Sequence, residues 1–336
     1  MYVPVVDSHH TPLMPTTPSR ARRWIKTRKA TPFWDHGLWC VRLNVAPAAR
    51  LLQPVAVGLD PGSKREAYTI KSAAHTYLNI EAETPAWVKE HVKTRREMRR
   101  TRRYRKTPCR ANRHNRTRGG LPPSTKARWQ WKLRVCRWLD RLYPITAFVV
   151  EDISTETRPG KRRWNGSFSP LEVGKLWFYT ALGELHPLVT RDGWDTKRLR
   201  DALGLHKSKA KLSGRFEAHC IDSWALANFY TGGHLVPDNT QMVYVVPLRF
   251  HRRQLHRLQP EPGGVRKPYG GTRSHGLTRG SLVQHTTLGL VYVGGWMKDR
   301  LSLHRMRDGK RLTQTAKPAD CRFRAYNSWR TTLAPR

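Results

Sequence analysis

The chain has 336 residues, enough for about two domains that each bury a core of their own. Lysine and arginine together number 63 against 24 aspartate and glutamate residues, so the formal net charge is +39. A surface this positive attracts polyanions and disfavours basic proteins and most small cations as partners. Nucleic acid is therefore the first partner to expect, and an anionic membrane surface is the second.

No segment is expected to cross a membrane. The longest apolar run is Ile145–Val150, which Thr146 interrupts, whereas a spanning helix needs roughly 20 apolar residues. Polar residues at Asp7–His10 occupy the place where a signal peptide would be apolar. The five cysteines are scattered and form no CxxC pair, so neither a zinc ribbon nor a disulfide framework is predicted. We therefore expect a cytoplasmic or nucleoid-associated protein.

Residues 1–53 are predicted to form a small basic module. Pro12–Pro15 is typical of a turn. Thr17 can cap a short helix at Ser19–Lys26, because Pro18 suits the first helical position.

Residues 54–87 are expected to begin the main core. Val55–Leu59 is a short apolar run, typical of a buried strand, and Asp60 follows it in a Pro-Gly turn. Further strands are predicted at Arg65–Lys71 and His75–Glu83. An aspartate at the end of a strand is more often a turn residue than a ligand, so Asp60 alone is a weak signal.

Residues 88–120 form a strongly basic segment. Lys93–Arg118 contains thirteen lysine or arginine residues and one acid, Glu97, and its first half has no helix breaker before Pro108. A helix with arginine on all faces suits a nucleic acid that presents phosphates on more than one side, although a solvated basic arm is the alternative. The candidate nucleic-acid contacts in this segment are Arg95, Arg96, Arg99, Arg100, Arg102, Arg103 and Arg105.

Residues 121–240 are expected to complete an α/β core. An amphipathic helix is predicted at Ser124–Leu142, a strand at Ala147–Val150 and a helix at Phe216–Tyr230. The intervening residues 155–215 are basic and aromatic and carry few strong signals.

Three carboxylates in this core suit a metal site. Asp60 and Glu151 each follow an apolar strand, and Asp222 shares a helix face with His219 at i and i+3. Oxygen ligands of this kind favour two Mg²⁺ ions, with Mn²⁺ as a substitute, in phosphodiester hydrolysis. His219 has a pKa range suited to activating water, although a buried structural histidine is equally expected.

Residues 241–336 are short strand-like segments with glycines and basic residues, which predicts a small β-barrel domain. Asp308-Gly309 lies between Leu301–Leu303 and Arg311–Thr313, a strong hairpin signal. The candidate nucleic-acid contacts in this part are Arg252, Arg253, Lys267, Tyr269, Arg273 and Arg279.

Several segments resemble, in chain order, the IscB and IsrB families of transposon-encoded nucleases. Val57–Ser63, Val149–Asp152 and Glu217–Ala227 resemble the three RuvC motifs. Pro12–Pro15 resembles the PLMP segment that opens these proteins, and the arginine run resembles their bridge helix. Arg266–Gly271 also looks like their C-terminal part. The resemblance covers nearly the whole chain.

The short distance between the second and third motifs selects the IsrB group. IscB carries an HNH nuclease domain there, whereas 67 residues separate Glu151 from His219 and contain no His-Asn-His arrangement. Ala67, where many RuvC folds place glycine, is a minor departure.

The resemblance implies an α/β fold with a mixed RNase H-like (RuvC) sheet in a prokaryotic protein. It also implies a monomeric protein in a ribonucleoprotein, which binds a structured omega RNA and double-stranded target DNA beside a target-adjacent motif. Such an enzyme nicks the non-target strand. By the same resemblance, the candidate arginines of residues 88–120 would contact the guide RNA or its heteroduplex with DNA, and the candidates in residues 241–336 would contact the target DNA. Asp60, Glu151 and Asp222 would then ligate Mg²⁺, and His219 would assist.

Three other functions remain open. A structure-specific RuvC-type resolvase would be a compact dimer without the arginine helix or the flanking modules. A DDE transposase shares the fold but orders its acids Asp, Asp, Glu. A non-catalytic RNA-binding or ribosome-associated protein would account for the charge and leave the three acids unexplained.

Overall fold

The structure is a computed structural model whose described residues fall into two compact units. The described residues are 1–47, 50, 52–104, 121–153, 170–210, 213–248, 273–297, 299–326 and 328–333. Those within 1–31 and 41–243 form one unit, and those within 32–40 and 244–333 form the other. The five segments expected from the sequence stay a prediction.

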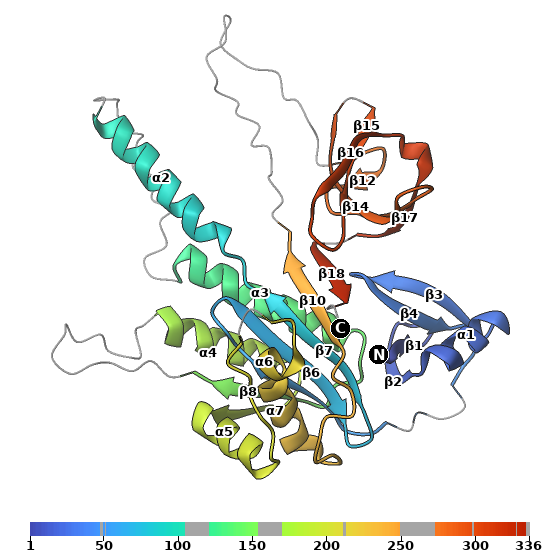
Figure 1. Cartoon of the computed structure of the whole chain (residues 1–336), viewed down its shortest axis with the longest axis vertical. Coiled ribbons are helices and arrows are strands. Elements are labelled where there is room, and N and C mark those ends of the chain that lie inside the picture. Colours follow the sequence, from blue (N-terminus) through green and yellow to red (C-terminus); the bar gives the residue numbers. More distant parts are fainter. Residues whose placement is uncertain are drawn as a thin grey trace, which may run out of the picture. The chain divides into compact units, whose positions relative to one another are not determined.

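A small sheet and one helix form the N-terminal part (Figure 1). The sheet has the order β2-β1-β4-β3. Its strands are β1 (Val3–Val6), β2 (Pro12–Thr16), β3 (Ala30–Asp35) and β4 (Leu38–Leu43). Helix α1 (Pro18–Lys26) begins as predicted, because the Thr17 hydroxyl accepts a hydrogen bond from the Arg20 amide at 3.4 Å.

The predicted turn at Pro12–Pro15 is wrong, because these residues lie in strand β2. They pair antiparallel with β1, with Pro12 opposite Val6 and Leu13 opposite Val5. Strand β2 is an edge strand, so its outer side has no neighbouring strand to pair with. Proline has no backbone N–H to donate and is tolerated at such a position. A proline-rich stretch can therefore be a strand here.

The predicted mixed sheet is present and carries the strands that follow. Its order is β18-β10-β7-β6-β5-β8-β9. Strands β5, β6 and β7 are antiparallel, whereas β5, β8 and β9 are parallel. The strands are β5 (Val55–Asp60), β6 (Arg65–Ser72), β7 (Thr76–Glu83), β8 (Ala147–Asp152), β9 (Leu188–Asp192), β10 (Met242–Pro247) and β18 (Trp329–Leu333). Strand β5 is central and buried, which explains its unbroken apolar sequence.

After α1, the described residues of the first unit contain further helices, including the one predicted at Ser124–Leu142. They are α2 (Trp87–Tyr104), α3 (Pro123–Asp140), α4 (Pro170–Gly183), α5 (Gly193–Ala202), α6 (Phe216–His219) and α7 (Ile221–Thr231). Within the residues described, no helix is long and apolar enough to cross a membrane.

The single helix predicted at Phe216–Tyr230 is wrong, because it is two helices. Helix α6 ends at His219 and α7 begins at Ile221, with Cys220 between them at φ −106° and ψ −3°. Cys220 is fully buried, and its thiol donates to the Ile80 carbonyl oxygen of β7 at 3.5 Å. The interruption between the two helices therefore lies where the chain contacts the sheet.

The C-terminal residues form an antiparallel sheet in the order β16-β15-β14-β13-β17. The strands are β13 (Leu282–His285), β14 (Gly289–Met297), β15 (Arg300–Arg305), β16 (Arg311–Ala316) and β17 (Cys321–Ala325), beside a ribbon of β11 (Arg273–Ser274) and β12 (Leu277–Thr278) and a 3₁₀ turn at Pro318–Asp320. The predicted hairpin is confirmed, since β15 pairs with β16 across Gly309 at φ +73°.

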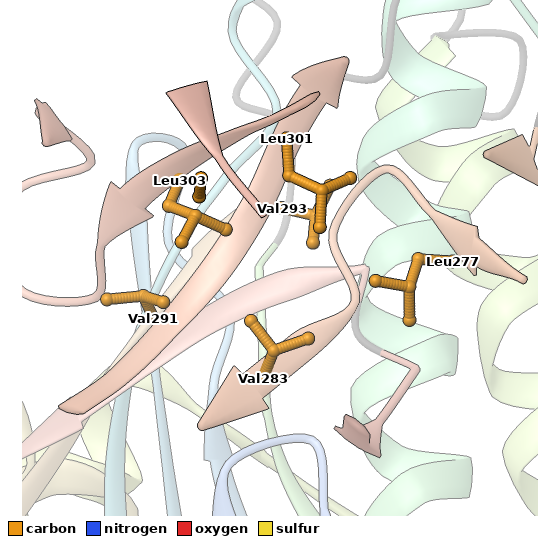
Figure 2. Close-up of a cluster of buried hydrophobic side chains, with 7 residues drawn as sticks. Leu277, Val283, Val291, Val293, Leu301 and Leu303 are labelled. Atoms are coloured by element: carbon orange, nitrogen blue, oxygen red, sulfur yellow. The ribbon is translucent and has the colours of Figure 1, made fainter. Parts of the chain in front are cut away.

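A compact apolar cluster holds this second sheet together. Figure 2 shows Val283, Val291, Val293, Leu301 and Leu303 gathered between strands. All five side chains are essentially inaccessible to solvent. The part is β-rich as expected, and its closure into a barrel stays a prediction.

Candidate metal centre

Three carboxylates from separate elements meet at one edge of the mixed sheet. Asp60 ends β5, Glu151 lies near the end of β8, and Asp222 lies in the first turn of α7. Strands β5 and β8 run parallel with Leu59 opposite Val150, so the next residue on each strand carries its carboxylate to the same edge. One ligand atom from each carboxylate lies within 4.8 Å of the others. The three acids, which occur in the order Asp, Glu, Asp along the chain, thus form one cluster.

A glycine on β5 brings α7 close enough to complete this cluster. A Cβ atom at Gly58 would lie 1.8 Å from the Ser223 carbonyl oxygen and 2.8 Å from the Ala227 amide nitrogen. Only a residue without a side chain permits this backbone contact. The contact sets the distance between Asp222, one residue before Ser223, and Asp60, two residues after Gly58.

Burial and mutual repulsion disfavour full ionisation of the three acids. Burial raises the pKa of Glu151 to about 8, and the neighbouring charges of Asp60 and Asp222 add to the effect. Burial also raises the pKa of Asp60, which hydrogen-bonds to the Glu151 side chain. Carboxylates held this close are stabilised by a nearby cation.

Two basic side chains supply positive charge at Asp222. Arg200, from α5, places its Nε 2.6 Å from Asp222 Oδ1. Lys207, from the segment between α5 and α6, contacts Asp222 Oδ2 and lies 4.0 Å from Asp60 Oδ2. Neither residue was predicted, because one arginine and one lysine among 63 basic residues carry no distinguishing signal in the sequence.

His219 does not join the three carboxylates among the described residues. Its Nε2 lies 2.7 Å from the Ser213 carbonyl oxygen, and its Nδ1 lies 3.6 Å from Glu81 Oε1. Glu81 also accepts a hydrogen bond from Arg65 at 2.6 Å. Both ring nitrogens of His219 therefore have partners outside the cluster, and its role in activating water stays a prediction.

The donor set fits Mg²⁺ or Mn²⁺. All three side chains offer oxygen, the ligand that these ions prefer over nitrogen or sulfur. Mg²⁺ binds oxygen at about 2.1 Å, so two ligands of one ion lie up to about 4.2 Å apart, and paired ions lie about 3.5–4 Å apart. Ligand atoms within 4.8 Å of one another suit this geometry.

The predicted nucleic-acid contacts are only partly described by the structure. Five arginines of α2 are exposed: Arg95, Arg96, Arg99, Arg100 and Arg103. The side chain of Arg102 lies outside the described residues, as do Arg105, Arg252, Arg253, Lys267 and Tyr269. For Arg273 only the backbone, in β11, is described, and Arg279 is half-buried. Their contacts with RNA or DNA stay predictions.

Comparison with known proteins gives two similarities. The sequence model of a family described as "RRXRR protein" matches residues 3–163, a range that includes Asp60, Glu151 and the run Arg99-Arg100-Thr101-Arg102-Arg103. A solved structure of T. thermophilus RuvC in complex with a Holliday junction substrate is 14% identical to this chain. It covers 54% of this chain and 98% of its own, with a TM-score of 0.29. No curated protein matches the chain.

Proposed function

We propose that this protein is an RNA-guided, divalent-metal-dependent DNA endonuclease that nicks the non-target strand. The observation that carries the proposal is the convergence of Asp60, Glu151 and Asp222 in a chain of net charge +39. Carboxylates that gather within a basic protein suit a multivalent cation, and the basic surface suits the polyanionic substrate.

The three acids would together ligate two metal ions. Asp60 and Glu151 come from neighbouring parallel strands, and Asp222 comes from α7, which packs against β5 at Gly58. When bound, two Mg²⁺ ions would supply an activated water and stabilise the leaving oxygen of a phosphodiester. Because the carboxylates lie on the sheet and on a packed helix rather than on loops, they hold their geometry without reorganising.

The guide RNA is assigned to α2 in this proposal. The side chains that the structure describes in its second half are exposed, and Arg95, Arg99 and Arg103 follow each other at i, i+4 spacing. Like charges at this spacing destabilise an isolated helix, and phosphates around the helix would relieve the repulsion. The RRXRR family, whose model covers α2, is found in IscB- and IsrB-like proteins, which supports an omega RNA as the partner.

The test uses the full-length protein with its co-purified RNA, Mg²⁺ and a supercoiled target plasmid. Wild type should give open-circular DNA, and only an end label on the non-target strand should shorten. Asp60→Asn should lose cleavage and keep RNA and DNA binding, because it removes a ligand charge within the cluster. Asp299→Asn removes an acid whose side chain is 72% exposed and should cleave like wild type.

The alternatives have distinct outcomes in the same assay. Cleavage by Asp60→Asn at the wild-type rate would show that the metal assignment is wrong. Cutting of a four-way junction without RNA would point to a resolvase, and heterogeneous co-purified RNA with no cleavage would point to an RNA-binding protein. Cutting of both strands at equal rates would refute the nickase proposal.

A further inference from the structure

We propose that Lys207 is an internal counter-ion that competes with metal ions for Asp60 and Asp222, and that Arg200 is a positioning residue that stays on Asp222 when metal binds. This inference rests on the proposed function, because it assigns roles to two cations beside the same carboxylates. Both residues form an ion pair with Asp222, but the two ion pairs are assigned different roles.

Lys207 occupies the space between two of the expected ligands. Its ammonium group contacts Asp222 Oδ2 and lies 4.0 Å from Asp60 Oδ2, so it neutralises carboxylates that come from α7 and β5. A divalent ion ligated by the same two oxygens would stand next to this ammonium group, and the two positive charges would repel. Metal binding therefore requires Lys207 to withdraw.

The attachment of Lys207 allows this withdrawal. The residue lies outside any helix or strand, between Ala202 at the end of α5 and Phe216 at the start of α6. Its side chain is 40% exposed, against 14% for Arg200. A lysine on a flexible four-carbon stem that already reaches solvent can turn outward without disturbing a packed element.

Arg200 differs in each of these respects. It lies within α5, its side chain is mostly buried, and its Nε is 2.6 Å from Oδ1, the Asp222 oxygen that Lys207 does not contact. Its guanidinium is planar and holds a fixed geometry. The ion pair of Arg200 with Oδ1 therefore holds the Asp222 carboxylate in place, as partners of metal ligands commonly do.

The experiment measures Mn²⁺ binding to the full-length protein by electron paramagnetic resonance of the free ion. Lys207→Met should bind Mn²⁺ at least about fivefold more tightly, because a competing cation is gone. Arg200→Met should bind about 10–100-fold more weakly, because Asp222 loses its orientation. Lys209→Met is the matched control, since it removes one exposed positive charge from the same segment, and it should bind like wild type.

The melting temperatures of the variants, measured with a metal chelator present, distinguish these roles from a general loss of structure. Both Lys207→Met and Arg200→Met leave carboxylates uncompensated and should lower the melting temperature, yet metal affinity should move in opposite directions. Lys207→Arg keeps a cation and should keep an affinity closer to wild type than Lys207→Met.

An unchanged or weaker affinity in Lys207→Met overturns the role of Lys207, and an unchanged affinity in Arg200→Met overturns that of Arg200. Failure of the proposed function would give a different result in the Mn²⁺ binding experiment. If wild type binds Mn²⁺ no more tightly than Asp60→Asn, the metal centre itself is wrong.

Discussion

The contact between β5 and α7 makes Gly58→Ala a sharp test of how the site is assembled. The added Cβ would lie 1.8 Å from the Ser223 carbonyl oxygen, whereas ordinary contact begins at 3.4 Å. Helix α7 would have to move by about 1.6 Å, because the Ser223 oxygen belongs to the backbone and a Cβ position does not change with side-chain rotation. Asp222 would move with it, away from Asp60.

The expected effects follow from this displacement. Overpacking of this kind costs about 1–3 kcal/mol, and a backbone contact belongs at the upper end. In a unit of this size, a loss of about 3 kcal/mol in unfolding free energy lowers the melting temperature by about 6–12 °C. A misplacement of about 1 Å in a catalytic constellation can cost about 100-fold in rate, so cleavage should fall by at least that factor at temperatures where the variant is folded.

The assay combines thermal unfolding, Mn²⁺ binding and single-turnover nicking of the target plasmid. Gly183→Ala is the control, because a Cβ at that position meets nothing within 4 Å. Wild-type melting and cleavage in Gly58→Ala would refute the inference that this glycine sets the distance between Asp60 and Asp222.

Two further predictions concern nucleic-acid binding and stability. Replacing Arg95, Arg99 and Arg103 together by Gln should weaken RNA binding and reduce the slope of log affinity against log salt by about 0.7–0.9 per lost phosphate contact, while circular dichroism shows helix α2 retained; an unchanged slope would indicate a solvated arm. Lys71 is fully buried, and burial lowers its pKa from 10.5 to about 8. The unfolded chain therefore binds more protons between these values, so the unfolding free energy of wild type should rise relative to Lys71→Met by up to about 3 kcal/mol from pH 8 to pH 10.5. Denaturant titrations across that range check this, and a constant difference would contradict it.

Much of the candidate site was predictable because its parts have local signals. An apolar run followed by an acid marks the end of a buried strand, and this holds for Asp60 on β5 and for Glu151 on β8. The hairpin at Gly309 was equally local, since its residue types match the backbone angles that the turn requires. Periodicity also located α3, whose apolar residues recur at helical spacing.

Tertiary structure alone decided the form of two chain segments and the side chains that surround the three acids. Pro12–Pro15 became an edge strand because β1 was available to pair with it, and the helix expected at Phe216–Tyr230 broke where Cys220 met β7. Lys207 and Arg200 reach Asp222 from positions 15 and 22 residues earlier in the chain, across a segment with no periodic pattern. Charge is abundant in this sequence, and sequence cannot show which cation lies against which carboxylate. That depends on distances of a few ångströms between elements, and these are set only when the sheet and α7 pack together.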